Sequence, residues 1–281
     1  MSELVRFAVE PLVRAALLED IGRGGDLTTD AIVPGNTQAR ARIVARKAGV
    51  VAGLEPAFLA FRLLDDTVEC VPAAADGDAV AAGESVAEIR GRARTILTGE
   101  RTALNFLCRL SGIATATREL VDLLAGTRTR VADTRKTTPG LRALEKYAVR
   151  CGGGDNHRFG LDDAVLVKDN HLAIAGSIHA AVAAVRARVG HTVKVEVEVD
   201  TLEQLREALD EPIDAVLLDN MTPEQLGHAV RLAGGRVLTE ASGGVTPDTI
   251  VAIAHSGVNV VSAGWLTHSA PALDFGLDVG S

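Results

Sequence analysis

The sequence predicts a mixed α/β protein in which an α+β half is followed by a run of βα units that forms a barrel. The chain has 281 residues, of which 47% are hydrophobic, so it can bury the cores of two ordinary domains. From residue 129 onward, short apolar segments alternate with helical ones, as in a parallel sheet with crossover helices. The last four apolar segments begin at Val193, Asp214, Arg236 and Val258, and such short, even units favour a closed barrel over an open doubly wound sheet.

The first half of the chain combines both kinds of secondary structure. Segments with helical apolar spacing alternate there with segments of two-residue alternation, and glycine-rich turns separate them. Ser111-Gly112 is expected to break the last helical stretch in two. The predicted elements are, in order, a helix over 3–20, paired strands over 38–52, a helix over 54–64, a strand over 67–72, a turn and strand over 76–91, and two helices over 93–124.

The second half is predicted to contain six strands, each ending in polar or glycine residues. The strands cover 129–133, 164–167, 193–199, 214–219, 236–241 and 258–264, with helices over 178–189, 201–210, 223–234 and 246–256. A barrel brings the carboxyl ends of its strands to one mouth, where barrel enzymes place their active sites. A single acid at such a position is more often a helix cap, but six polar ends in succession indicate a site. These ends are Thr134-Arg135-Lys136, Lys168-Asp169-Asn170, Glu198, Asp219-Asn220, Glu240-Ala241-Ser242-Gly243-Gly244 and Ser262-Ala263-Gly264.

The segment 133–171 concentrates cations around the turn Gly152-Gly153-Gly154. Arginine recurs there beside lysine or histidine after apolar segments, and its planar guanidinium is the preferred partner of a carboxylate or phosphate held at two points. Pairing with nearby aspartates on a solvated face is the alternative. The pattern favours an anion site made of Arg135, Lys136, His157, Arg158 and Lys168.

Two further groups of residues point to a phosphorylated ligand. Ser242-Gly243-Gly244 precedes a predicted helix, and Gly264 follows one strand later, which is how barrels build a phosphate site from late loops and a helix N-terminus. Glu198 and Asp219 suit ribose hydroxyls or Mg²⁺, because Mg²⁺ is usually held by one or two carboxylates together with substrate phosphates.

Composition limits the partners and the location. The net charge of -8 disfavours nucleic acid and anionic lipid as partners. No apolar run reaches the roughly 18 residues that span a bilayer, and the N-terminus lacks a signal-like apolar stretch, so a cytoplasmic protein is expected. The three cysteines form no C-x-x-C pair, which argues against a zinc site and a disulfide framework. Cys151 is either a nucleophile or, as is far more common, a small packed side chain.

Long ordered motifs in this chain resemble the quinolinate phosphoribosyltransferases, also called carboxylating nicotinate-nucleotide pyrophosphorylases. The resemblance covers nearly the whole chain, including Glu19-Asp-Ile-Gly and Asp26-Leu-Thr-Thr near its start. The other motifs are Gly99-Glu-Arg-Thr-Ala-Leu-Asn, Leu110-Ser-Gly-Ile-Ala-Thr, Thr134-Arg-Lys-Thr-Thr-Pro-Gly, Glu145-Lys-Tyr-Ala-Val, Gly152-Gly-Gly-Asp-Asn-His-Arg and Lys168-Asp-Asn-His.

The resemblance implies a fold and an activity. The fold is an N-terminal α/β sandwich over 1–112 and an incomplete TIM-like α/β barrel over 113–268, with a C-terminal tail over 269–281 that can pack back on the N-terminal domain. The activity converts quinolinate and phosphoribosyl pyrophosphate (PRPP), with Mg²⁺, to nicotinate mononucleotide, pyrophosphate and CO₂ in NAD synthesis. The protein is expected to be a homodimer or a larger homo-oligomer.

The resemblance also implies roles for the candidate site residues. Quinolinate's carboxylates are assigned to Arg101, Arg135, His157, Arg158 and Lys168, with Arg101 supplied to the neighbouring subunit's site. Lys136, beside Thr134, is shared toward the pyrophosphate. Glu198 and Asp219 serve the ribose and Mg²⁺, directly or through PRPP, and Ser242, Gly243, Gly244 and Gly264 receive the 5′-phosphate. Lys136, Lys168, Glu198 and Asp219 are the catalytic candidates.

Three alternatives remain open from the sequence. A molybdenum-transport-associated relative shares this fold, although the run from Thr134 to Arg158 argues against it. A barrel lyase would use Lys168 to form a Schiff base. A non-catalytic anion-binding or carrier protein would bind the same ligands without turnover.

Overall fold

A computed structural model describes residues 3–280, and the chain divides into two compact units. The first comprises the described residues of Met1–Arg118, Thr138–Gly153 and Ser269–Ser281, and the second comprises Glu119–Thr137 and Gly154–His268. Met1, Ser2 and Ser281, at the outer ends of the expected domains, lie outside the described residues. No helix within 3–280 is both long and apolar enough to cross a membrane.

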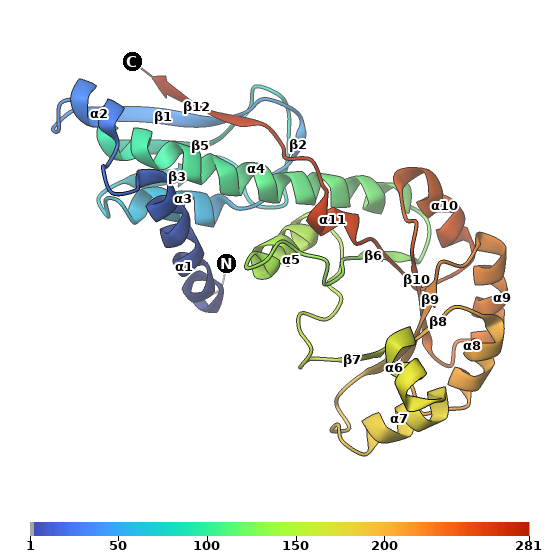
Figure 1. Ribbon diagram of the computed structural model, residues 1–281. Coiled ribbons are helices and arrows are strands. Elements are labelled where there is room, and N and C mark those ends of the chain that lie inside the picture. Colours follow the sequence, from blue (N-terminus) through green and yellow to red (C-terminus); the bar gives the residue numbers. More distant parts are fainter. Residues whose placement is uncertain (1–2, 281) are drawn as a thin grey trace. The chain divides into compact units, whose positions relative to one another are not determined.

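The first unit is organised around an antiparallel sheet with the order β12-β1-β5-β3. Its C-terminal strand lies beside β1, pairing Phe275 with Ala45 and Gly280 with Arg40 (Figure 1). The range 38–52 does contain two strands, but β1 pairs with β5 and β12, whereas β2 pairs with β4. The strands are β1 (Gln38–Ala45), β2 (Gly49–Val50), β3 (Glu69–Pro72), β4 (Ala79–Val80), β5 (Ser85–Arg92) and β12 (Phe275–Gly280), and the helices are α1 (Glu3–Ile21), α2 (Leu27–Ile32), α3 (Leu54–Arg62), most of α4 (Ala93–Leu123) and α5 (Arg142–Cys151).

Helix α4 runs without a break through Ser111 and Gly112, so the prediction of two helices was wrong. The glycine serves close packing instead of a turn. A Cβ at Gly112 would lie 2.1 Å from the carbonyl oxygen of Pro271. Glycine is therefore required where the C-terminal segment crosses the helix.

A buried carboxylate fixes the start of α5 and the loop that leads to it. Glu145 is fully buried, and its Oε1 accepts hydrogen bonds from Arg109 Nη2 at 2.8 Å and Thr138 Oγ1 at 2.7 Å. Its Oε2 accepts from the backbone N–H of Thr138 at 2.9 Å. Because a buried charge must be paired and hydrogen-bonded, this network determines where the Thr137–Leu141 loop can run.

The second unit is an incomplete barrel, as the family resemblance implied, whereas the closed barrel favoured by the spacing of the apolar segments was wrong. Its parallel sheet has the order β6-β11-β10-β9-β8-β7, so β6 and β7, consecutive in the chain, lie at opposite ends of the ladder. Among the described residues no ladder joins these two strands, which leaves the barrel open on that side. The strands are β6 (Arg130–Ala132), β7 (Val165–Val167), β8 (Val195–Val199), β9 (Ala215–Asp219), β10 (Leu238–Ser242) and β11 (Val260–Ser262). The helices are α6 (Asp169–Ala175), α7 (Ile178–Arg186), α8 (Leu202–Leu209), α9 (Pro223–Ala233), α10 (Pro247–His255) and α11 (Trp265–His268) (Figure 1).

Local sequence signals determine where the barrel helices begin. Thr201 accepts a hydrogen bond from the backbone of Gln204 at 3.2 Å, and the Gln204 side chain accepts from the Thr201 N–H at 3.1 Å. Thr222 and Gln225 repeat this capping box at the start of α9. Each cap is worth about 1 kcal/mol and fixes the length of the preceding loop. These loops form the mouth of the barrel.

Candidate active site

A cavity of about 620 Å³ lies at the carboxyl ends of the strands in the second unit. All the candidate site residues except Arg101 line it, so the structure brings the strand ends together as the barrel prediction required. The lining residues that carry polar groups or glycine are Thr134, Arg135, Lys136, His157, Arg158, Lys168, Glu198, Asp219, Glu240, Ser242, Gly243, Gly244, Thr246, Ser262, Gly264, Trp265 and His268.

One part of the cavity wall is cationic. Arg135 Nε is buried and has no hydrogen-bond partner among the described residues. Burial lowers the pKa of the Arg158 guanidinium, and the positive charge of Arg135 lowers it further. Arg158 Nη1 also donates to the Ala164 carbonyl at 3.0 Å, which fixes its direction. Two guanidiniums that repel one another, one with an unused donor, form a site that an anion with two carboxylates would stabilise.

The acidic residues adjoin this cationic wall. Glu198 Oε2 lies 3.1 Å from Lys168 Nζ, and the lysine side chain is about half exposed. Asp219 Oδ2 accepts a hydrogen bond from Asn220 Nδ2 at 2.6 Å. Burial raises the pKa of Asp219, and the negative charge of Asp200 raises it further. A carboxylate crowded by burial and by another acid favours a nearby cation, so these oxygens fit Mg²⁺.

Two glycines with positive φ form a turn in the cavity lining after β10. Gly243 and Gly244 have φ values of +92° and +60°, and they lead into α10. A Cβ at Gly243 would lie 2.1 Å from Asn220 Oδ1, so no other residue fits there. Backbone N–H groups in such a turn, followed by a helix N-terminus, form an anion-binding nest.

Gly243→Ala should weaken binding of the phosphorylated substrate while leaving the cationic wall intact. The substitution forces a Cβ into a left-handed turn already filled by Asn220, which costs about 1–3 kcal/mol. We expect a rise in KM for that substrate of about tenfold or more, measured in steady-state assays. Gly235→Ala is the matched control, because Gly235 is also left-handed but has no atom within 4 Å of its Cβ position. Equal effects of the two substitutions would argue against the phosphate nest.

The loop after β6 is held in place by short contacts. Thr134 Oγ1 accepts from the Lys136 N–H at 3.0 Å, and Thr267 Oγ1 donates to the Lys136 carbonyl at 2.8 Å. A Cβ at Gly264 would meet Lys136 Cδ at 2.9 Å. Gly264 therefore allows the lysine side chain to lie against the β11 loop.

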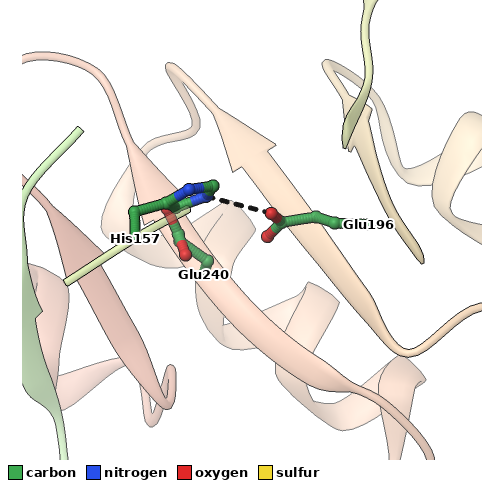
Figure 2. Close-up of side chains that lie close together, drawn as sticks. All are labelled: His157, Glu196 and Glu240. Carbon is green, nitrogen blue, oxygen red and sulfur yellow. Dashed lines mark hydrogen bonds and ion pairs between the residues drawn. The ribbon is translucent and has the colours of Figure 1, made fainter. Parts of the chain in front are cut away.

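Three buried acids contact His157. Asp133 and Glu196 were not among the sequence candidates, and Glu240 was named only as part of a polar strand end. Asp133 accepts from the His157 N–H at 2.9 Å. Figure 2 shows Glu196 and Glu240 facing the ring of His157, with Nε2 3.1 Å from Glu196 Oε2. Glu196 and Glu240 are inward-facing strand residues. Their only sequence signal is an acid recurring inside an apolar barrel strand, as in Val195-Glu196-Val197-Glu198-Val199.

Family models match almost the entire chain. The C-terminal domain of quinolinate phosphoribosyl transferase matches residues 113–278, and the N-terminal domain of the same family matches residues 26–111. The chain belongs to the quinolinate phosphoribosyltransferase family. The predicted resemblance is thereby confirmed.

Individual members of the family are similar over their full length. A probable nicotinate-nucleotide pyrophosphorylase [carboxylating] of Bacillus subtilis is 47% identical over 271 residues, covering 96% of this chain and 93% of that protein. The nicotinate-nucleotide pyrophosphorylase [carboxylating] of Mycobacterium leprae is 44% identical, covering 97% of each. The crystal structure of NadC from Streptococcus pyogenes superimposes with a TM-score of 0.94 at 44% identity and covers 100% of both chains.

Arg101 and Cys151 stand apart from the cavity. Arg101 is exposed on α4, in the first unit, and is not among the residues that line the cavity. Cys151 lies at the end of α5, also in the first unit, and burial raises the pKa of its thiol to about 11. A thiol that stays protonated near neutral pH is a poor nucleophile, so the packed interpretation of Cys151 is the better one.

Proposed function

We propose that this protein transfers the phosphoribosyl group of PRPP to quinolinate with loss of CO₂, giving nicotinate mononucleotide and pyrophosphate in de novo NAD synthesis. The names of its relatives and the family match support this activity. One observation about the molecule supports it: a single cavity is lined by cationic side chains, by acids and by a glycine-rich turn. That arrangement suits an aromatic dicarboxylate and a sugar phosphate bound side by side.

Quinolinate binds to the cationic wall in this proposal. Arg135 and Arg158 receive its carboxylates through paired N–H donors, and the unused Arg135 Nε supports this role. Lys168 adds a third cation, and His157 lies beside it in the cavity lining. The pyridine nitrogen is thereby presented to the centre of the cavity, where the sugar is held.

PRPP binds across the rest of the mouth. Its 5′-phosphate binds to Ser242, Gly243, Gly244 and Gly264, which line the cavity. The carboxylates of Glu198 and Asp219, also in the lining, accept hydrogen bonds from the ribose hydroxyls. The C1–pyrophosphate bond breaks as the pyridine nitrogen bonds to C1, and positive charge develops on the sugar. Nearby carboxylates stabilise that charge, while Lys136 stabilises the negative charge on the leaving pyrophosphate.

Mg²⁺ fits this site as a cofactor held by Glu198 and Asp219, directly or through PRPP. When bound, it neutralises charge on the pyrophosphate. Loss of CO₂ then needs little from the protein. The nitrogen that carries the sugar is cationic, so its charge stabilises the electron pair that stays on ring carbon C2 when CO₂ departs, and C2 then binds a proton from solvent. Positioning is the main contribution of the side chains.

The protein is proposed to act as a homo-oligomer in the cytoplasm. We infer a homodimer or larger homo-oligomer in which Arg101 reaches the neighbouring subunit's cavity, because Arg101 belongs to the first unit and does not line its own barrel's cavity. The cytoplasm is the proposed location, since the substrates are soluble metabolites.

Release of CO₂ from quinolinate labelled in the 2-carboxylate tests the function. We expect release that depends on both PRPP and Mg²⁺, with nicotinate mononucleotide formed in equal amount. A carrier protein would bind both ligands without release, and this outcome would refute the proposal. Borohydride trapping tests the Schiff-base alternative. We expect no adduct, because Lys168 is half exposed and ion-paired with Glu198, whereas Schiff-base lysines are usually desolvated.

A further inference from the structure

The hydrogen bonds of His157 define its tautomer. The backbone N–H of Arg158 donates to His157 Nδ1 at 2.8 Å. A backbone amide can only donate, so Nδ1 carries no hydrogen, and the ring hydrogen of the neutral imidazole must lie on Nε2. Nε2 lies 3.1 Å from Glu196 Oε2 and 3.7 Å from Glu240 Oε1 (Figure 2).

The two glutamates form a buried pair beside His157, and Glu240 also lines the substrate cavity. Glu196 comes from β8 and Glu240 from β10, and both side chains are about nine-tenths or more buried. Each has an Oε1 without a hydrogen-bond partner among the described residues. Burial raises the pKa of Glu240 to about 7, and the negative charges of Glu196 and Asp133 add to this, opposed by His157.

A metal ion is the competing explanation for two carboxylates and an imidazole within 4.8 Å of one another. It conflicts with the hydrogen bond at Nδ1. If Nδ1 accepts a hydrogen bond in the neutral ring, Nε2 carries the hydrogen and has no lone pair for a metal. The same geometry is satisfied by an Nε2–H donating to Glu196.

We propose that Glu196 and Glu240 are positioning residues that hold His157 in the Nε2–H tautomer and thereby fix the peptide of Arg158. The Glu196 carboxylate accepts the Nε2 hydrogen, and Glu240 lies 3.7 Å from the same ring nitrogen. His157 Nδ1 then holds the Arg158 N–H, while Ala164 holds its guanidinium. This rests on the proposed function, in which Arg158 receives a carboxylate of quinolinate.

The first measurement is the tautomer itself, observed by ¹⁵N NMR of the histidine rings at neutral pH. The His157 signals are assigned by their absence from His157→Asn. We expect an unprotonated Nδ1 and a protonated Nε2 in the wild type, and the same tautomer in Glu240→Gln, which leaves the Glu196 acceptor in place. An Nδ1–H tautomer, an imidazolium, or stoichiometric zinc in the purified protein would overturn the proposal.

The second measurement separates positioning from general damage. Glu196→Leu removes the acceptor and should raise KM for quinolinate on the order of tenfold or more while changing KM for PRPP less than about threefold. Glu196→Gln keeps an acceptor oxygen and should recover most of this loss. Glu211→Leu is the matched control, because Glu211 also bonds a histidine, His179 at 2.8 Å, and His179, unlike His157, is not among the residues that line the cavity.

Equal rises in both KM values, or no recovery in Glu196→Gln, would overturn the positioning role. If Glu196→Leu fails to fold, the glutamine variant and the wild-type tautomer still decide the question. The two proposals fail separately: absence of CO₂ release would refute the function, whereas the NMR result does not depend on turnover.

Discussion

Nicotinate is expected to be used at least about a thousandfold less efficiently than quinolinate, measured as kcat/KM with saturating PRPP. Nicotinate lacks the 2-carboxylate, so one of the two anionic groups that the adjacent Arg135 and Arg158 are proposed to bind would be missing, and the buried Arg135 Nε could remain without a partner. A site built to hydrogen-bond a group rejects the analogue that lacks it, because its own buried polar atoms are left without partners. Nicotinate also has no 2-carboxylate to release, so the comparison measures nucleotide formation.

Arg135→Lys tests whether geometry or charge produces this selectivity. Lysine keeps the charge but replaces a planar fork with a single ammonium, so quinolinate use should fall on the order of tenfold or more. The selectivity over nicotinate should shrink in parallel, because only quinolinate uses the second donor. Comparable use of nicotinate by the wild type, or wild-type kinetics for Arg135→Lys, would contradict the assignment of the cationic wall.

Mixed subunits of two inactive variants are expected to recover about a quarter of wild-type activity. Arg101→Ala removes the arginine that we infer to act in the neighbouring cavity, and Lys168→Ala damages the cavity itself. A dimer with one subunit of each kind then has one intact site and one doubly damaged site. Random exchange makes half of the dimers mixed, and half of the sites in those dimers work, which gives the quarter.

The exchange needs its own control. Subunits are mixed by mild unfolding and refolding, and two affinity tags verify that mixed dimers form. Each variant treated alone should stay inactive, and wild type treated alone sets the full value. If tagged mixed dimers form but no activity returns, Arg101 does not act across the interface, although the activity assignment would stand.

The sequence identified the mouth of the barrel because strand ends are local features. Lys168 and Asp219 each follow an apolar run, and the parallel topology makes such positions neighbours without any knowledge of long-range packing. Glu196 was missed because it lies inside its strand, two residues before the strand-end residue Glu198. Nothing local distinguishes an acid that faces a barrel interior from one that faces solvent.

The interpretation of Gly112 failed for a related reason. Glycine in a helical stretch predicts a break when only its neighbours in sequence are considered. At position 112 glycine is required because Pro271, far away in the chain, occupies the space that a side chain would fill. Close approach between distant segments cannot be read from local spacing.

Because β12 pairs with β1, one edge of β1 can be covered only at the end of synthesis. The strand that covers one edge of β1 consists of Phe275–Gly280, so a nascent chain carries that edge uncovered until almost every residue has left the ribosome. A bare strand edge invites pairing with other chains. Chains released early, for example after His268, should therefore aggregate or be degraded even though every residue lining the cavity has been made.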